Sequence, residues 1–132
     1  PRALEKAFGL YPDVKVVVAA HLYGTPGKID EIKAICEKNH AILIEDAAES
    51  LGATYKGVET GTFGDYNAIS FNGNKIITGS SGGMLLTDDK EAAEKVRKWS
   101  AIRRRRNYEE STLPCHAGKR SGKILPAFGA WL

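Results

Sequence analysis

The sequence predicts an α/β fold in which helices cover both faces of a mostly parallel sheet, giving three layers (α/β/α). Two apolar runs, residues 14–20 and 41–44, lack the alternation of a half-exposed strand, which is typical of strands buried on both faces of a parallel sheet. Between them, residues 29–39 carry an apolar stripe at helical spacing. A strand, a helix and a strand within about 30 residues predict a right-handed parallel βαβ unit.

The segments around this unit predict further short elements. Apolar residues recur at helical spacing over residues 1–11, and Gly9 marks the expected end of that helix. Residues 67–71 and 84–87 are typical of short strands. The glycine-rich segment 79–83 predicts the turn between these two strands.

A last helix is predicted to begin at Asp88 and to end near Ala101. Asp88 is the expected N-cap, and Glu91 is its capping-box partner. Beyond the helix no periodicity is sustained, so we divide the chain into a domain over residues 1–101 and a basic, irregular tail over residues 102–132. The apolar residues of this helix are Ala92, Ala93, Val96 and Trp99.

Composition excludes several classes of protein. The chain has 132 residues, of which 42% are hydrophobic and 27% charged, as in an ordinary globular domain and unlike a collagen or a disordered tail. Its longest apolar run, residues 16–20, is far shorter than the roughly 20 residues that span a membrane. Cys36 and Cys115 form no CxxC and have no histidine at ligand spacing, so we expect no metal, no disulfide framework and a reducing, cytoplasmic location. Because the chain begins at Pro1 without a leader pattern, we expect a fragment of a longer protein.

Charge is unevenly distributed along the chain. Residues 1–96 carry 10 Lys and Arg against 14 Asp and Glu, a net charge of −4, whereas residues 97–132 carry 9 against 2, a net charge of +7. Four consecutive arginines, Arg103–Arg106, suggest an alternative function in binding nucleic acid or acidic surfaces. No aromatic residues interleave with them and no helix-turn-helix pattern is present, so nucleic acid is not the expected partner.

Candidate chemical groups follow the predicted parallel strands, where ligands of open α/β sheets bind. Asp46 comes directly after a buried strand, so its carboxylate is either a functional group at the sheet edge or a brace for the following loop. Lys75 lies between a strand and a glycine-rich turn, beside apolar residues, where an amine loses proton affinity and gains nucleophilicity. The alternative for Lys75 is a solvated surface lysine. Ser70 offers a hydroxyl that could bind phosphate.

Several motifs occur in a fixed order. They are HLYG at 21–24, IEDAAESLGA at 44–53, GD at 64–65, SFNGNK at 70–75 and GGM at 82–84. Together they resemble the DegT-type nucleotide-sugar aminotransferases, which are pyridoxal-phosphate enzymes of fold type I. The likeness covers the chain from about Leu4 to about Trp99 and is greatest to the enzymes that aminate 4-keto sugars on UDP.

The resemblance implies that the chain is the central part of the large domain of such an enzyme. Lys75 is then the catalytic residue, which forms a Schiff base with pyridoxal phosphate and moves a proton. Asp46 would pair with the pyridine nitrogen and Ser70 would bind the phosphate. Glu49, where many members carry glutamine, would lie near the phenolic oxygen, and His21 would pack beside or beneath the cofactor.

The resemblance also implies a reaction and its partners. The parent enzyme would transfer an amino group, from glutamate, to a nucleotide-linked keto sugar used in cell-surface glycan or lipopolysaccharide synthesis, and would work as a homodimer. The related sugar dehydratases carry histidine in place of the lysine, so Lys75 favours amino transfer. No family motif is found in residues 102–132, which we interpret as translated out of frame.

Overall fold

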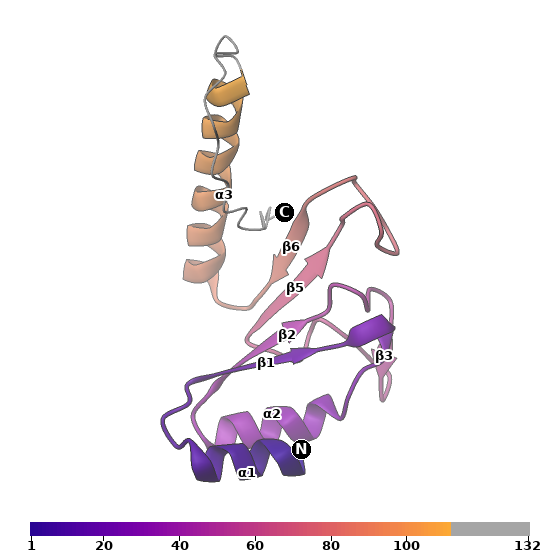
Figure 1. The fold of residues 1–132 in the computed structure, drawn as a ribbon, viewed down its shortest axis with the longest axis vertical. Coiled ribbons are helices and arrows are strands. Elements are labelled where there is room, and N and C mark those ends of the chain that lie inside the picture. Colours follow the sequence, from indigo (N-terminus) through magenta and orange to yellow (C-terminus); the bar gives the residue numbers. More distant parts are fainter. Residues whose placement is uncertain (112–132) are drawn as a thin grey trace, which may run out of the picture.

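The computed structural model describes residues 1–111 of the chain, and the side chains of residues 1–101. Its main feature is a sheet with the strand order β1-β2-β5-β6 (Figure 1). The sheet comprises β1 (Val16–Ala20), β2 (Ile42–Asp46), β5 (Tyr66–Ser70) and β6 (Gly83–Leu86). Strands β1, β2 and β5 are parallel, and β6 is antiparallel to β5. This confirms the mostly parallel sheet.

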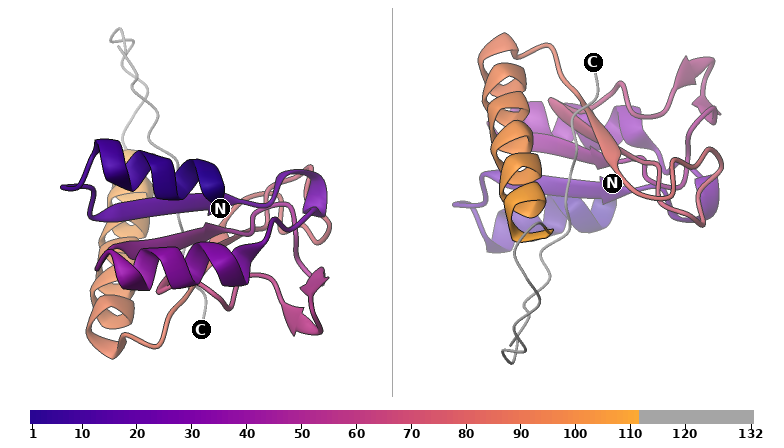
Figure 2. Two further views of the ribbon diagram at one scale, coloured as in Figure 1. Left: turned by 90° about the horizontal axis from the view of Figure 1, so that it is seen from below. Right: turned by 90° about the horizontal axis from the view of Figure 1, so that it is seen from above.

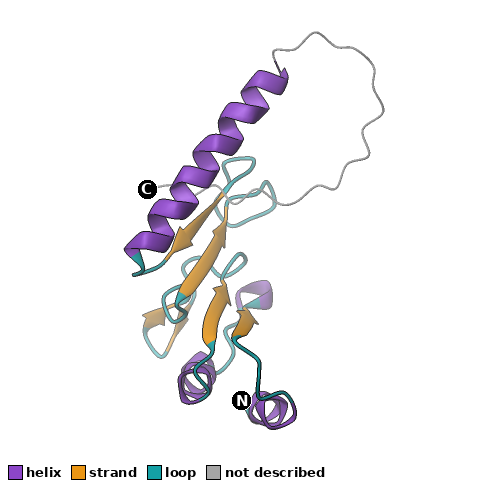
Figure 3. Ribbon diagram, turned by 90° about the vertical axis from the view of Figure 1, so that its left-hand side faces the viewer, coloured by secondary structure: helices purple, strands orange, loops and turns teal. Residues whose placement is uncertain are grey.

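Helices lie on both sides of the sheet. Helices α1 (Arg2–Leu10) and α2 (Ile29–Lys38) lie on one side and α3 (Lys90–Ser111) lies on the other, as the two opposed views of Figure 2 show. The predicted three-layer arrangement is therefore confirmed. Helix α3 runs beside β6 and extends past the end of the sheet (Figure 3). Within residues 1–111, no helix has both the length and the apolar character needed to cross a membrane.

Two smaller features connect β1 to α2 and β2 to β5. A 3-10 turn, η1 (Leu22–Gly24), follows β1. Between β2 and β5 the chain forms an antiparallel hairpin of β3 (Thr54–Tyr55) and β4 (Val58–Glu59). Its two turn residues, Lys56 and Gly57, both have positive φ, as a hairpin turn matched to the twist of its strands requires.

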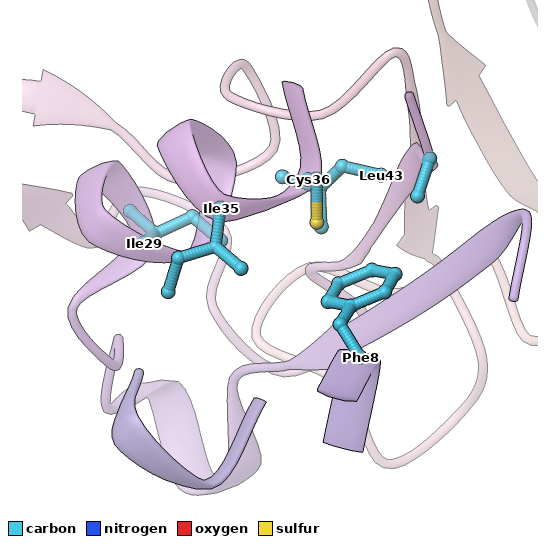
Figure 4. Packing of buried hydrophobic residues seen from close by; sticks show 6 residues of the cluster. Phe8, Ile29, Ile35, Cys36 and Leu43 are labelled. Atoms are coloured by element: carbon cyan, nitrogen blue, oxygen red, sulfur yellow. The ribbon is translucent and has the colours of Figure 1, made fainter. Parts of the chain in front are cut away.

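The hydrophobic core lies between the sheet and the pair α1 and α2 (Figure 4). The stripe predicted for α2 forms one wall of this core, because Ile29, Ile35 and Cys36 recur on one helical face. Phe8 closes the core from α1 and Leu43 closes it from β2. Val17 and Ala19 of β1 pack against the same cluster. Alternate residues of β1 and β2 thus face α1 and α2.

The prediction that both strands are buried on both faces is wrong for the described part of the chain. Val16 and Val18 are 47% and 62% exposed, and Ile42 is 41% exposed. These residues share the sheet face opposite α1 and α2, because side chains alternate along a strand. Helix α3 lies beside β6 and leaves this part of the face open.

Two helix boundaries differ from the sequence prediction. Gly9 lies inside α1, which continues to Leu10. Helix α3 is capped by Asp89, whose Oδ1 accepts the Ala92 N–H at 3.0 Å, rather than by Asp88. It continues to Ser111 instead of ending near Ala101, so residues 102–111 are helical and the predicted irregular tail is wrong for them. Residues 112–132 lie outside the described part.

Candidate functional site

The candidate site lies where the parallel strands end. Asp46 is the last residue of β2 and Ser70 is the last residue of β5. In the sheet register Asp46 is opposite Ala68, which places Asp46, Ala68 and Ser70 on one face of the sheet. This is the face opposite α1 and α2. The structure therefore brings two of the predicted site residues to one edge and one face of the sheet.

Asp46 braces the loop that follows it. Its Oδ1 accepts the Ala48 N–H at 3.1 Å, a local contact that sets the direction of the carboxylate. The side chain is half-buried. Within residues 1–101, no group donates to its second oxygen, Oδ2. Asp46 thus braces the loop through one oxygen, and Oδ2 remains able to accept a hydrogen bond, so this contact is compatible with both alternatives for Asp46.

Lys75 is paired with Glu49. The Lys75 Nζ lies 3.4 Å from Glu49 Oε1, and only 16% of the lysine side chain is exposed. This contradicts the alternative of a solvated surface lysine. The other oxygen of Glu49, Oε2, accepts the Tyr23 N–H at 2.8 Å. The Tyr23 N–H and the Lys75 ammonium group together lower the pKa of the Glu49 carboxyl, so it is an anion near neutral pH.

Glu49 also holds a strained turn at the edge of the site. Tyr23 has a φ of 54°, in the left-handed region that costs a residue other than glycine roughly 1–2 kcal/mol. The hydrogen bond from its backbone to Glu49 helps to hold this conformation. One carboxylate thus ties the turn after β1 to the lysine that follows β5.

Within residues 1–101, the Ser70 hydroxyl has no acceptor for its hydrogen. Its Oγ accepts the Asn72 N–H at 3.3 Å. Because this contact uses a lone pair, the hydroxyl hydrogen remains available to an acceptor such as a phosphate oxygen. The predicted role of Ser70 stays a prediction, and the geometry suits it.

The His21 side chain is buried against Glu45, on the side of the sheet that faces α1 and α2. It is 2% exposed, and its Nε2 donates to Glu45 Oε1 at 2.7 Å. Glu45 is completely buried and lies in β2 between Ile44 and Asp46. Sequence reasoning missed Glu45. Its position in the sequence could have revealed it. Glu45 lies two residues after the core residue Leu43 in the same strand, so its side chain points to the same face, the one that packs on α1 and α2.

These groups form a set of complementary chemical functions. The site provides a partly buried amine, a carboxylate with an unused oxygen, and a hydroxyl with an unused hydrogen. They are chemically complementary to an aldehyde, a protonated ring nitrogen and a phosphate, which are groups that pyridoxal phosphate carries. Among the described residues, no group of three or more His, Cys, Asp or Glu side chains could hold a metal ion.

Comparison with known proteins gives matches over most of the chain. The model of the DegT/DnrJ/EryC1/StrS aminotransferase family matches residues 1–121. EpsN of Bacillus subtilis (strain 168), whose name places it among pyridoxal phosphate-dependent aminotransferases, is 52% identical over 74% of this chain and 26% of its own. The GDP-perosamine synthase of Caulobacter vibrioides is 44% identical over 65% of this chain and 23% of its own.

The fold of the chain also matches a solved structure. The Escherichia coli GDP-4-keto-6-deoxy-D-mannose-3-dehydratase, with bound hydrated pyridoxal phosphate, matches with a TM-score of 0.62 and 34% identity. The match covers 68% of this chain and 23% of that structure. The chain spans about a quarter of the length of the curated relatives it matches.

Proposed function

Because this chain belongs to the DegT/DnrJ/EryC1/StrS aminotransferase family, we propose that it carries the lysine side of the active site of a nucleotide-sugar aminotransferase. The reaction would transfer an amino group from glutamate to a nucleotide-linked keto sugar, in synthesis of cell-surface glycan or lipopolysaccharide precursors. The observation that carries the proposal is the partly buried amine of Lys75, paired with Glu49 beside the sheet edge that ends in Asp46.

Each residue of the set has a task. When bound, pyridoxal phosphate supplies an electron sink for amino transfer. The Lys75 amine would hold the cofactor and carry a proton to and from the reacting carbon. The Asp46 carboxylate would keep a proton on the pyridine nitrogen, and the Ser70 hydroxyl would donate to the phosphate. Glu49 would lie near the phenolic oxygen and keep Lys75 oriented.

Lys75 favours amino transfer over the dehydration that other members of the family perform. The matched Escherichia coli structure is named as a dehydratase, so family membership alone does not select the reaction. The resemblance implies that such dehydratases replace this lysine with histidine. A lysine held by a carboxylate therefore supports the transferase.

Three further features belong to the proposal. We propose glutamate as amino donor, which is checked by comparing glutamate and glutamine in single-turnover assays of the whole enzyme. We propose a homodimer, which is checked by sedimentation equilibrium. The buried free thiol of Cys36 suits a reducing compartment, and this supports a cytoplasmic location.

The test of the proposed site is covalent labelling. The purified chain is incubated with pyridoxal phosphate, reduced with borohydride and digested, and the modified peptides are mapped by mass spectrometry. Lys75→Ala is the test variant. Lys56→Ala is the matched control, since Lys56 is an exposed lysine that pairs with Asp30.

Two outcomes distinguish a formed site from a bare motif. Selective labelling of Lys75 that persists in Lys56→Ala supports the proposal. Scattered labelling of all lysines, unchanged by Lys75→Ala, contradicts it.

The alternative function of Arg103–Arg106 stays a prediction, because their side chains lie outside the described part. A salt-dependent mobility shift would test it.

A further inference from the structure

We propose that Glu45 is a positioning residue, which acts with His21 to hold the carboxylate of Asp46 in place. Neither residue needs to contact the reacting atoms. The inference rests on the proposed function for the role of Asp46, but the placement of Asp46 can be measured without any cofactor.

Four donors converge on the Glu45 carboxylate. Its Oε1 accepts the Gly61 N–H at 2.6 Å and the His21 Nε2–H at 2.7 Å. Its Oε2 accepts the N–H groups of Phe63 and Gly64 at 2.9 and 3.3 Å. A carboxylate that only accepts can satisfy all four donors, and no neutral side chain of the same size can. The completely buried side chain therefore ties the 61–64 turn and the His21 ring to β2.

The backbone around Asp46 is held on one side by His21 and on the other by β5. The His21 N–H donates to the Asp46 carbonyl oxygen at 3.0 Å, so residue 21 binds Glu45 through its ring and Asp46 through its backbone. On the other side, the Ala47 N–H donates to the Ala68 carbonyl at 2.9 Å. A movement of the Glu45 side chain is therefore transmitted through His21 to the backbone that presents Asp46.

The backbone of the 61–64 turn lies in close contact with β2, and a side chain at Gly64 would not fit between them. A Cβ built on Gly64 would lie 2.8 Å from the Leu43 carbonyl oxygen and 3.0 Å from the Glu45 nitrogen. Because this backbone touches the strand, the hydrogen bonds to Glu45 cannot lengthen independently of β2. This contact couples the Glu45 carboxylate, on the α1 and α2 side of the sheet, to the position of Asp46 on the opposite face.

The test uses the full 132-residue chain and the variants Glu45→Gln, His21→Ala and His21→Gln. Glu45→Gln keeps the size of the side chain but turns an NH₂ group toward donors. His21→Gln retains a donor for Glu45, and His21→Ala removes it. The matched control is Asp65→Asn, which replaces the charged acceptor of the Leu43 N–H in the same connection by a neutral amide oxygen and leaves Glu45 untouched.

The first readout is hydrogen exchange of the Ala48 amide, whose acceptor is Asp46 Oδ1. After correction for global stability, Glu45→Gln and His21→Ala are expected to speed this exchange about tenfold or more. Glu45→Gln leaves buried N–H donors without an acceptor, and His21→Ala leaves the buried Glu45 carboxylate without one of its donors. His21→Gln should restore exchange close to the wild-type rate, and Asp65→Asn should leave it unchanged. Faster exchange confined to residues 61–64, with Ala48 unaffected, would show that Glu45 only stabilises the turn and would overturn the proposal.

The second readout is the concentration of pyridoxal phosphate that half-labels Lys75 after borohydride reduction. Glu45→Gln should raise it about tenfold, and Asp65→Asn should not. An unchanged half-labelling concentration in Glu45→Gln, with the wild type labelled, overturns the inference. If the wild-type chain is not labelled at Lys75, the proposed function fails, and the Ala48 exchange rates alone decide whether Glu45 positions Asp46.

Discussion

Glu45 and Asp46 are adjacent residues of β2 whose carboxylates lie on opposite faces of one sheet. The Glu45 carboxylate is completely buried on the side of α1 and α2, where three backbone N–H groups and His21 surround it. The Asp46 carboxylate is half-buried on the other side, and Ala48 is its donor among the described residues. Strand alternation thus separates a structural acid from one that can meet a ligand.

Asp46→Asn should weaken retention of pyridoxal phosphate. The substitution keeps the shape of the side chain but removes the negative charge that would pair with the ring nitrogen. A lost charge-assisted hydrogen bond corresponds to an affinity about tenfold lower or more. Equilibrium dialysis followed by absorbance spectroscopy measures this affinity. Asp30→Asn, on the exposed surface of α2, is the control and should bind as the wild type does; equal affinity in Asp46→Asn would contradict the assigned role.

Gly64→Ala should destabilise the fold. The added Cβ would lie 2.8 Å from both the Leu43 carbonyl oxygen and Asn67 Oδ1, so the turn must move away from β2. Overpacking of this kind costs about 1–3 kcal/mol. Urea unfolding followed by circular dichroism gives the free energy of unfolding.

Gly27→Ala is the matched control for that substitution. A Cβ at Gly27 would have no heavy atom within 4 Å, and its φ is not in the left-handed region. Its free energy of unfolding should stay within about 0.5 kcal/mol of the wild-type value. Equal stability of the two variants would show that the turn is not held tightly against β2.

Leu43→Ala should cost more than any exposed substitution in the same sheet. Leu43 is 2% exposed and lies in the core formed by α1, α2 and β2. Truncation of a buried leucine to alanine costs about 2–5 kcal/mol. Val18→Ala, at a side chain that is 62% exposed, should cost less than about 1 kcal/mol. Similar denaturant midpoints for Leu43→Ala and Val18→Ala would show that Leu43 does not contribute to the core as described.

The ion pair between Asp30 and Lys56 should make stability depend on pH in acid. The Lys56 ammonium group, 2.6 Å away, lowers the pKa of the Asp30 carboxyl from 3.8 to about 2. Because the folded pKa is depressed, the stabilisation is fully present above pH 3.8 and is lost as the pH falls through about 2. Urea unfolding at pH 2 to 6 should therefore show a smaller loss of stability in Asp30→Asn than in the wild type. Parallel curves for the two proteins would mean that solvent screens the pair completely.

Local patterns predicted most of the elements. The stripe over residues 29–39 predicts α2 to within one residue, and its apolar members do form the core. The exposure of Val16 and Val18 could not be predicted in the same way, because an apolar run does not reveal whether a layer covers its second face. The length of α3 was also missed, since its arginine-rich half has no apolar stripe from which a helix could be predicted.

The sequence by itself determined the type and order of the elements and the presence of an amine, an acid and a hydroxyl after predicted strands. These depend on residues a few positions apart, within one turn or one strand. Only the tertiary structure decided that Lys75 meets Glu49, 26 residues away, and that Glu45 rather than Asp46 is the buried acid. Burial and pairing depend on which distant segment packs against a residue. Here the connection from β4 to β5 returns over β2 and surrounds Glu45 with donors.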